Sequence, residues 1–446
     1  MSPETWDFTV SPADRRLLEV DVAGSRAHLI ALSVAGILTD EQADGLDNGL
    51  AQIAGEATAG TFAWDDADED VHSAVERRLG ELVGEDLAGR LHSARSRNDQ
   101  VALDLRLHIS ATAARHVEGL ASMVRTLARV AADSGETIVA AFTHLQQAQA
   151  VPFAHHLLAH AWPLVRDAGR FAYMTVRSAV SPLGAAAGGG TSLPVDPKAS
   201  AGALGMDTTF DNSLDAVASR DIVSEYVFCC AQALADLSRL SEEIVLWSST
   251  EFGWMTLPDS HSTGSSALPQ KRNPDIAELT RGKAASATGH LTAVLGIQKG
   301  LPLSYNRDLQ QDKEHLFAPG DDLDGALSSL GGLIAAAEFH PPPPGPNVVA
   351  LDLAEALVAR GVPFRRAHVT VGTLVRALED DGRTLADLTT DDLASAGGDF
   401  QPTDVALADP AASVAARRSA GGGSFDSVRR QLLKLDAWLG SLEERA

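Results

Sequence analysis

The feature that most constrains the fold is a series of long segments with the hydrophobic period of an α-helix. Residues 98–133 contain no proline and a single glycine, and their apolar residues recur at spacings of three and four, at Leu120, Met123, Val124, Leu127 and Val130. Similar stripes run through residues 152–179, 214–249, 274–295 and 323–334. Strand-like alternation is nearly absent. Five long amphipathic helices in succession predict an all-α fold built around a helical bundle.

Two interruptions suggest how the chain is divided. The proline run at 340–346 fits neither a helix nor a sheet and gives the clearest domain boundary, while a softer boundary lies near residues 92–97. We therefore predict an N-terminal helical domain at 1–94, a central long-helix domain at 95–340 and a small C-terminal helical domain at 341–446. Helices this apolar often need partners beyond their own chain, so we expect an oligomer built through the bundle.

Charge and cysteine content exclude several classes of protein. A formal net charge of −24 and a pI near 4.9 argue against a general nucleic-acid binder and against docking to anionic lipid. We find no secretory signal and no apolar run near 18 residues. The only two cysteines, Cys229 and Cys230, are adjacent in an apolar stretch and are interpreted as buried thiols. We expect a cytoplasmic protein without nucleic-acid or membrane partners.

The segment 262–275 is the polar stretch most suggestive of chemistry. Small hydroxyl residues surround Gly264, and Lys271, Arg272 and Asn273 follow immediately before a helix that starts at Pro274. A helix N-terminus beside two cations and an amide suits an anionic carboxylate. The alternative interpretation is a helix-capping linker.

Three further polar segments have both a functional and a structural interpretation. At 94–100, two arginines flank a serine and could hold a dicarboxylate or simply cap the next helix. At 143–149, polar residues surround His144, although a lone histidine is more often structural. The segment 304–314 could equally be a solvated helix face.

A metal site was also considered. His156 and His160 are spaced i, i+4 as metal ligands often are, but no glutamate lies between them and no cysteine is near. The sequence therefore predicts no metal site.

These segments resemble the fumarase/aspartase superfamily and, within it, the argininosuccinate lyases. Residues 262–275 are similar to the signature loop GSSxMPxKxNP. Four other segments match in the same order: HSARSRNDQ from His92, THLQQAQ from Thr143, NSLDAVASRD from Asn212 and YNRDLQQDKE from Tyr305. The resemblance covers nearly the whole chain, including residues 359–364, and is weakest in the first 20 residues.

The resemblance implies a three-domain fumarase/aspartase-like fold. Five helices of each subunit would form the twenty-helix core of a homotetramer, and each active site would be built by three subunits. It also implies a carbon–nitrogen lyase of the amidine-lyase type, which converts argininosuccinate to arginine and fumarate by anti elimination. A base removes a proton beside a carboxylate, the resulting dianion is stabilised, and the leaving nitrogen is protonated. No cofactor is implied.

Site residues are carried over position by position. Ser265 matches the catalytic base, His144 a proton donor or relay, and Glu278 the carboxylate paired with that histidine. Lys271 and Asn273 match residues that hold the reacting carboxylate. The positions that match substrate-binding residues or lie near the site are Arg97, Asn98, Thr143, Tyr305, Gln310, Lys313 and Arg220.

The N-terminus departs from the family pattern. It lacks the WGGRF-like opening, and Val10 occupies the position of a substrate-contacting serine, although Asp14 and Asp21 align well. After a small shift, Thr9 or Ser11 could substitute for that serine.

Three other departures lie closer to the predicted chemistry. Gln147 stands where arginine is usual, and Arg272 and Arg307 stand where lysines are usual. Arginine keeps the charge of lysine but not its geometry. These changes leave the elimination intact and open the identity of the leaving amine. The alternatives are a related lyase that releases fumarate from another N-substituted aspartate (an N-succinyl amine) and a catalytically inactive crystallin-like homologue. The group that protonates the leaving nitrogen also stays open.

Overall fold

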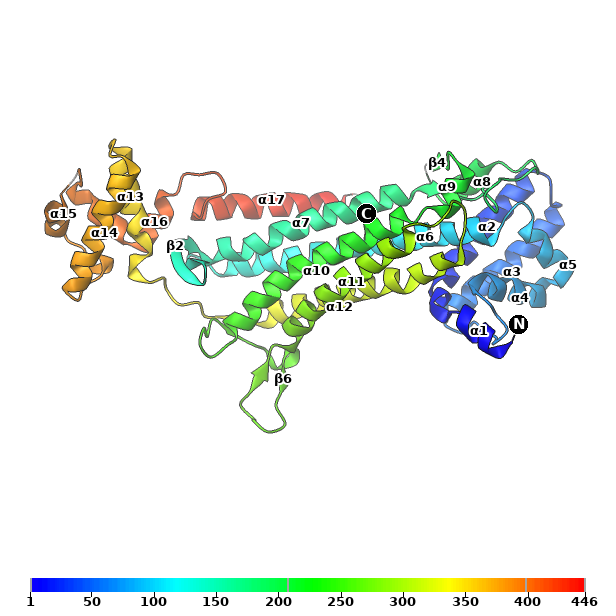
Figure 1. The fold of residues 1–446 in the computed structure, drawn as a ribbon, viewed down its shortest axis with the longest axis horizontal. Coiled ribbons are helices and arrows are strands. Elements are labelled where there is room, and N and C mark those ends of the chain that lie inside the picture. Colours follow the sequence, from blue (N-terminus) through cyan, green and yellow to red (C-terminus); the bar gives the residue numbers. More distant parts are fainter. Residues whose placement is uncertain (1, 207, 398, 445–446) are drawn as a thin grey trace. The chain divides into compact units, whose positions relative to one another are not determined.

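The computed structural model describes residues 2–206, 208–397 and 399–444, and these residues are predominantly helical (Figure 1). The outer limits predicted for the first and last domains, residues 1 and 446, lie outside the described residues. The longest helices are α6 (Arg97–Asp133), α7 (Phe153–Ser178), α10 (Asp221–Trp247), α11 (Asp275–Gln298) and α12 (Asp312–Ala336). They coincide with the five predicted hydrophobic stripes, so the all-α prediction is confirmed.

The chain forms two compact units. The first contains the residues up to Gly119, Asp167–Ala235 and Gly282–Gly325, and the second contains Leu120–Arg166, Asp236–Arg281 and the residues from Ala326 onward. Each of the five long helices contributes a segment to both units. The division into three domains stays a prediction.

The first unit adds short helices to its segments of the long ones. Asp70 and Ser73 form a capping box that starts α4, and Thr39 and Gln42 do the same for α3, which explains why these helices begin where they do. Leu17, Leu32, Leu46, Leu50 and Ile53 are fully buried between them. The elements are α1 (Pro3–Thr9), η1 (Pro12–Leu17), α2 (Leu18–Val34), α3 (Asp40–Thr58), α4 (Val71–Val83), α5 (Glu85–Ala88), η2 (Gly89–His92), β3 (Val180–Ser181), α8 (Pro197–Ala203), β4 (Thr208–Thr209), α9 (Ser213–Ala218) and η4 (Arg307–Gln311).

The second unit contains the short strands that the sequence did not reveal. Strand β1 (Ile138–Thr143) pairs antiparallel with β2 (Gln146–Pro152), so most of the polar segment 143–149 lies in strands. The sequence signal for a β-hairpin is weak here because these strands are rich in alanine and glutamine. The turn also lacks the usual Asn-Gly or Asp-Gly pair. Two more antiparallel pairs join β5 (Met255–Thr256) to β8 (Glu338–Phe339) and β6 (Thr263–Gly264) to β7 (Arg272–Asn273).

The β1–β2 hairpin is anchored by the C-terminal helices. Ala140 and Ala150 belong to the same buried core as Val349, Leu353 and Ala367. The remaining elements of this unit are η3 (Asp259–His261), η5 (Pro346–Val349), α13 (Ala350–Ala359), α14 (Phe364–Asp380), η6 (Leu385–Asp387), α15 (Thr390–Ala396), η7 (Pro402–Ala408), α16 (Pro410–Ala416) and α17 (Phe425–Glu443).

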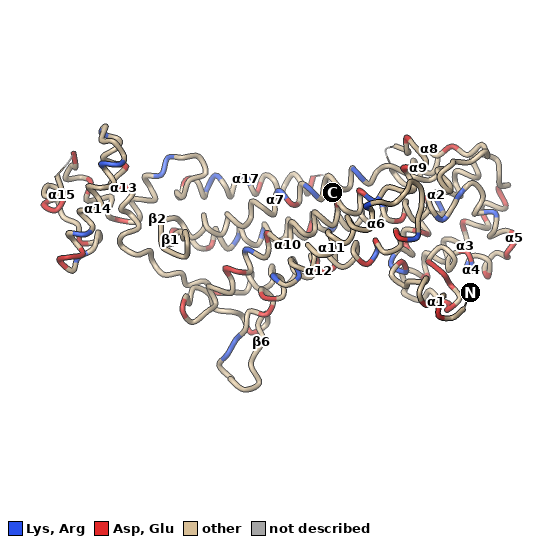
Figure 2. Tube along the Cα trace, in the orientation of Figure 1, with Lys and Arg blue, Asp and Glu red and all other residues tan. Residues whose placement is uncertain are grey.

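Two surface properties complete the description. Acidic and basic residues are interspersed along the described trace (Figure 2). In the described part of the chain, no helix combines the length and the apolar character that crossing a membrane requires.

Candidate active site

A pocket in the first unit gathers residues that lie far apart in the sequence. Arg97, Asn98, Tyr305, Gln310 and Lys313 all contribute to its lining. The first two open α6, and the others lie in or beside the segment that leads into α12. The structure thus brings five of the predicted substrate-binding residues to one cavity.

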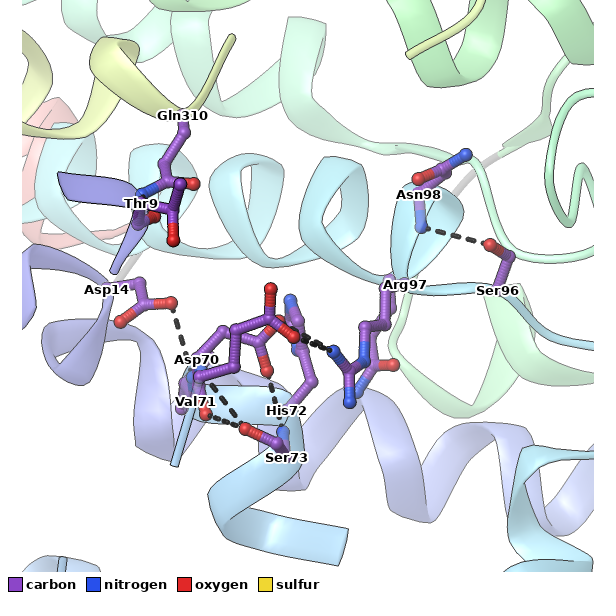
Figure 3. A network of polar contacts seen from close by, with 12 residues as sticks. Thr9, Asp14, Asp70, Val71, His72, Ser73, Ser96, Arg97, Asn98 and Gln310 are labelled. Carbon is purple, nitrogen blue, oxygen red and sulfur yellow. Dashed lines mark hydrogen bonds and ion pairs between the residues drawn. The ribbon is translucent and has the colours of Figure 1, made fainter. Parts of the chain in front are cut away.

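The same pocket has an acidic wall that the sequence did not predict. Arg97 Nη1 lies 3.2 Å from Glu69 Oε2. It also lies 3.3 Å from Asp70 Oδ2 (Figure 3). Glu69 also contacts Arg307, whose Nη2 lies 3.1 Å from its Oε1. Asp70 is fixed in place because it caps α4, accepting a 2.7 Å hydrogen bond from the backbone of Ser73. Cations and carboxylates therefore alternate around the opening.

Asp14 adds a third carboxylate to this wall. It is buried on η1, and its Oδ2 accepts a hydrogen bond from the backbone N–H of Val71 at 3.2 Å (Figure 3). Burial raises the pKa of the Asp14 carboxyl above its ordinary value. A cation that entered the pocket would oppose that effect and favour the ionised carboxylate.

The N-terminal segment contributes a carbonyl group to the network around the pocket. The backbone oxygen of Thr9 accepts hydrogen bonds from Arg307 Nη2 and from Gln310 Nε2, both at 2.9 Å. Arg307 Nε also donates to Gln310 Oε1 at 3.2 Å. The arginine that replaces the usual lysine is thus held by both neighbours.

The hydroxyl groups proposed to replace the missing serine at Val10 are engaged elsewhere. The Thr9 hydroxyl donates to the backbone oxygen of Thr5 at 2.9 Å, and the Ser11 hydroxyl accepts from the backbone N–H of Ala13 at 3.3 Å. Both hydroxyls bond within their own short helices.

A buried ion pair supports the start of α12. Arg220 Nε donates to Asp312 Oδ2 at 2.7 Å, and their side chains are 1% and 2% exposed. Lys313 Nζ lies 3.4 Å from Asp312 Oδ1. Buried charges are tolerated only when they are paired, so Asp312 stabilises both cations. Arg220 does not line the pocket itself and acts through Asp312.

A second buried network lies behind His72, which also lines the pocket. His72 Nδ1 lies 2.8 Å from Asp21 Oδ1 and 3.7 Å from Asp104 Oδ2, and Gln100 Nε2 donates to Asp21 at 2.5 Å. Burial and the adjacent charge of Asp21 raise the pKa of Asp104 well above its ordinary value. Asp104 can therefore keep its proton, which avoids repulsion between its carboxyl group and the neighbouring carboxylate of Asp21. Only the folded structure shows that His72 links this buried network to the pocket, because no sequence motif includes His72.

In the second unit, His144 occupies the tip of the β1–β2 hairpin. His144 and Leu145 form its two-residue turn with φ of 57° and 56°, which is the left-handed region that a type I′ turn requires. Without a glycine, each residue in that region costs about 1 kcal/mol or more, and such strain concentrates at functional sites. Thr143 and His144 are both exposed there.

The predicted signature loop projects from a small hairpin between β6 and β7 (Figure 1). Ser265 Oγ accepts hydrogen bonds from the backbone N–H groups of Ala267 and Leu268 at 3.3 and 3.2 Å. Asn273 Nδ2 donates to Thr263 Oγ1 at 3.3 Å, which ties the two ends of the loop together.

The catalytic residues predicted in the second unit do not meet within one chain. Among its described residues, no hydrogen bond or ion pair joins His144 to Ser265, Lys271 or Glu278. His144, Lys271 and Glu278 are all exposed. The pairing of His144 with Glu278 stays a prediction for the assembled protein.

Two departures from the family pattern have structural partners in this unit. Gln147 Oε1 accepts a hydrogen bond from the backbone N–H of Gly345 at 2.6 Å. Arg272 Nε lies 2.6 Å from Asp259 Oδ1. Both side chains therefore contact other parts of their own chain.

Comparisons with known proteins agree on one family. A lyase family model matches residues 7–289, and a model described as argininosuccinate lyase C-terminal matches residues 347–415. Argininosuccinate lyase from Leifsonia xyli subsp. xyli is 45% identical, and the alignment covers 100% of this chain and 95% of the relative.

Solved structures confirm the fumarase/aspartase-like fold. EDDS lyase in complex with formate has a TM-score of 0.84 and 27% identity, covering 98% of this chain and 89% of that chain. A variant of EDDS lyase with bound fumarate has a TM-score of 0.82 and 27% identity, covering 98% and 90%. Since both family models and a full-length relative agree, this chain belongs to the argininosuccinate lyase family of the fumarase/aspartase superfamily.

Proposed function

We propose that this protein is an argininosuccinate lyase, which eliminates arginine from argininosuccinate to form fumarate. The observation that carries the proposal is the acidic wall of the pocket in the first unit, formed by Asp14, Glu69 and Asp70. The guanidinium group of the substrate is planar and cationic and presents N–H donors that match carboxylates. Arg97 and Lys313, in the same pocket, supply charge that suits the carboxylates of the substrate.

The signature loop supplies the base in this proposal. Ser265 removes the proton beside the succinyl carboxylate, and two backbone N–H groups already point at its oxygen. Hydrogen bonds donated to an oxygen favour its ionised form, and a cation brought close to it, as proposed for Lys271, would add to that effect. Lys271 and Asn273 would hold the dianion that forms.

His144 and Glu278 complete the proton transfer. The imidazole acts as donor or relay at the leaving nitrogen, and the carboxylate orients it. Both side chains are exposed in a single chain, which suits residues that face a neighbouring subunit.

The active protein is proposed to be a homotetramer with a twenty-helix core and active sites shared by three subunits. Support comes from apolar side chains exposed on the long helices: Tyr173, Val176, Phe228, Leu279 and Leu295. Where such exposed apolar side chains gather into a patch, they mark protein–protein contacts. We place the enzyme in the cytoplasm, with arginine biosynthesis as its role.

A second candidate keeps the chemistry and changes the amine. Its motivation is Val10 in place of the serine, with the neighbouring hydroxyls bonded elsewhere. EDDS lyase, which is named for a different substrate, shares the fold at 27% identity. The 45% identity to an argininosuccinate lyase nevertheless favours the first candidate.

The test is fumarate formation, followed by ultraviolet absorbance, with argininosuccinate and a panel of N-succinyl amines. The proposal expects the highest kcat/KM for argininosuccinate. A higher value for another amine would establish the second candidate. No turnover of any of them would favour an inactive, crystallin-like protein.

A further inference from the structure

Three side chains of the second unit converge outside the site described above. His156 and His160 lie one turn apart on α7, and each Nε2 points to the same oxygen of Glu243 on α10, at 2.6 and 2.7 Å. The ligand atoms of all three residues lie within 4.8 Å of one another. The sequence shows the spacing of the two histidines but not their acidic partner, because the carboxylate lies 83 positions beyond His160.

We propose that His156, His160 and Glu243 bind a transition-metal ion, best suited to Zn²⁺. Two imidazole nitrogens and one carboxylate oxygen form a ligand set that zinc sites use, with water in the fourth position. The site differs from the zincin pattern considered above because its acid comes from a facing helix. That arrangement resembles the metal sites of helical bundles, where ligands project from neighbouring helices.

The two nitrogen–oxygen distances need only a small adjustment. Ligands at about 2.0–2.1 Å from a tetrahedral Zn²⁺ lie about 3.3 Å from each other. The nitrogen–oxygen distances of 2.6 and 2.7 Å would therefore lengthen by less than about 1 Å. Each imidazole would present its Nε2 lone pair with the proton on Nδ1, so the ion replaces the two hydrogen bonds to Glu243.

An ion can reach this group. The side chains of His156, His160 and Glu243 are 19%, 13% and 31% exposed. The only other described group with three such ligands, Asp21, His72 and Asp104, is fully buried and belongs to the network behind the pocket. Partial exposure leaves room for a water ligand.

A bound ion would stabilise the region that carries the predicted catalytic segments. His156 lies four residues beyond the end of β2, the strand that follows His144. Glu243 lies near the end of α10, ahead of the signature loop. Crosslinking these helix segments would raise the melting temperature, since a ligand that binds only the folded state stabilises it.

The experiment titrates the chelator-treated full-length protein with Zn²⁺ and with Co²⁺. Calorimetry should give one ion per chain, and Co²⁺ should show the visible absorption bands of a tetrahedral site. Glu243→Gln and His160→Gln should each weaken Zn²⁺ binding by at least about tenfold and remove the metal-dependent rise in melting temperature. His155→Gln is the matched control, because His155 lies on the same helix but contacts Gln431 instead.

Several outcomes would overturn the proposal. They are the absence of Zn²⁺ binding in the wild-type protein, unchanged affinity in both ligand variants, or an equal loss in His155→Gln. Circular dichroism without metal shows whether the variants fold. If they do not, X-ray absorption on the Zn²⁺-loaded wild type decides, since the proposal requires two imidazole nitrogens and a carboxylate oxygen.

Discussion

Asp312→Asn should strongly destabilise the start of α12, because it removes the charge that pairs with two buried cations. Arg220 Nε and Lys313 Nζ lie 2.7 and 3.4 Å from the Asp312 carboxylate, and all three side chains are at least 94% buried. A unit-charge pair at about 4 Å contributes about 4 kcal/mol at an effective dielectric constant near 20. Breaking a buried pair costs about 3–5 kcal/mol, because the remaining charge stays desolvated.

The assay is hydrogen exchange followed by mass spectrometry, which reports local stability in a chain too large for simple two-state unfolding. The loss of about 3–5 kcal/mol corresponds to about 10²- to 10⁴-fold faster exchange of the amides in the peptides that cover residues 217–224 and 309–316. Asp308→Asn is the matched control, since Asp308 is exposed on η4 and surface changes stay within about 0.5 kcal/mol. Equal exchange in the two variants would refute the assignment of Asp312.

Two further predictions concern pH and the acidic wall. Burial raises the pKa of Asp99 to about 6 from 3.8, so the stability contributed by its protonated carboxyl is fully present below about pH 4 and is lost as pH rises through about 6. The melting temperature of Asp99→Asn relative to wild type should therefore increase between pH 4.5 and 7. A difference that stays constant over this range would contradict the prediction. Glu69→Gln should raise KM for argininosuccinate about tenfold with little change in kcat, as expected for one charge-assisted contact; unchanged KM in steady-state kinetics would exclude Glu69 from substrate binding.

The helical architecture could be read from the sequence because long hydrophobic stripes leave no other way to bury apolar surface. Four of the polar segments between those stripes supplied most of the predicted site residues, and the pocket unites Arg97 with Lys313 as expected of one site. Local pattern was enough for the architecture, whereas the resemblance to the family supplied the site residues.

Contacts made only in three dimensions could not be predicted. Glu69 belongs to no motif in the sequence, and only the folded chain brings it into contact with Arg97 and Arg307. The turn at His144 could not be predicted because neither of its two left-handed residues is a glycine. Packing of the hairpin against the C-terminal helices must therefore stabilise the turn. Glu243 is likewise far from His160 in the sequence but contacts it in the folded chain.

The most direct test of the proposed elimination is fumarate release from argininosuccinate by the wild type, Ser265→Ala and Ser266→Ala. Ser266 is the neighbouring, exposed serine of the same loop and serves as the control. We predict turnover by the wild type and by Ser266→Ala, and a loss of at least about 10²-fold in Ser265→Ala, as expected for removal of a general base. No fumarate from the wild type, or an undiminished rate in Ser265→Ala, would contradict the account.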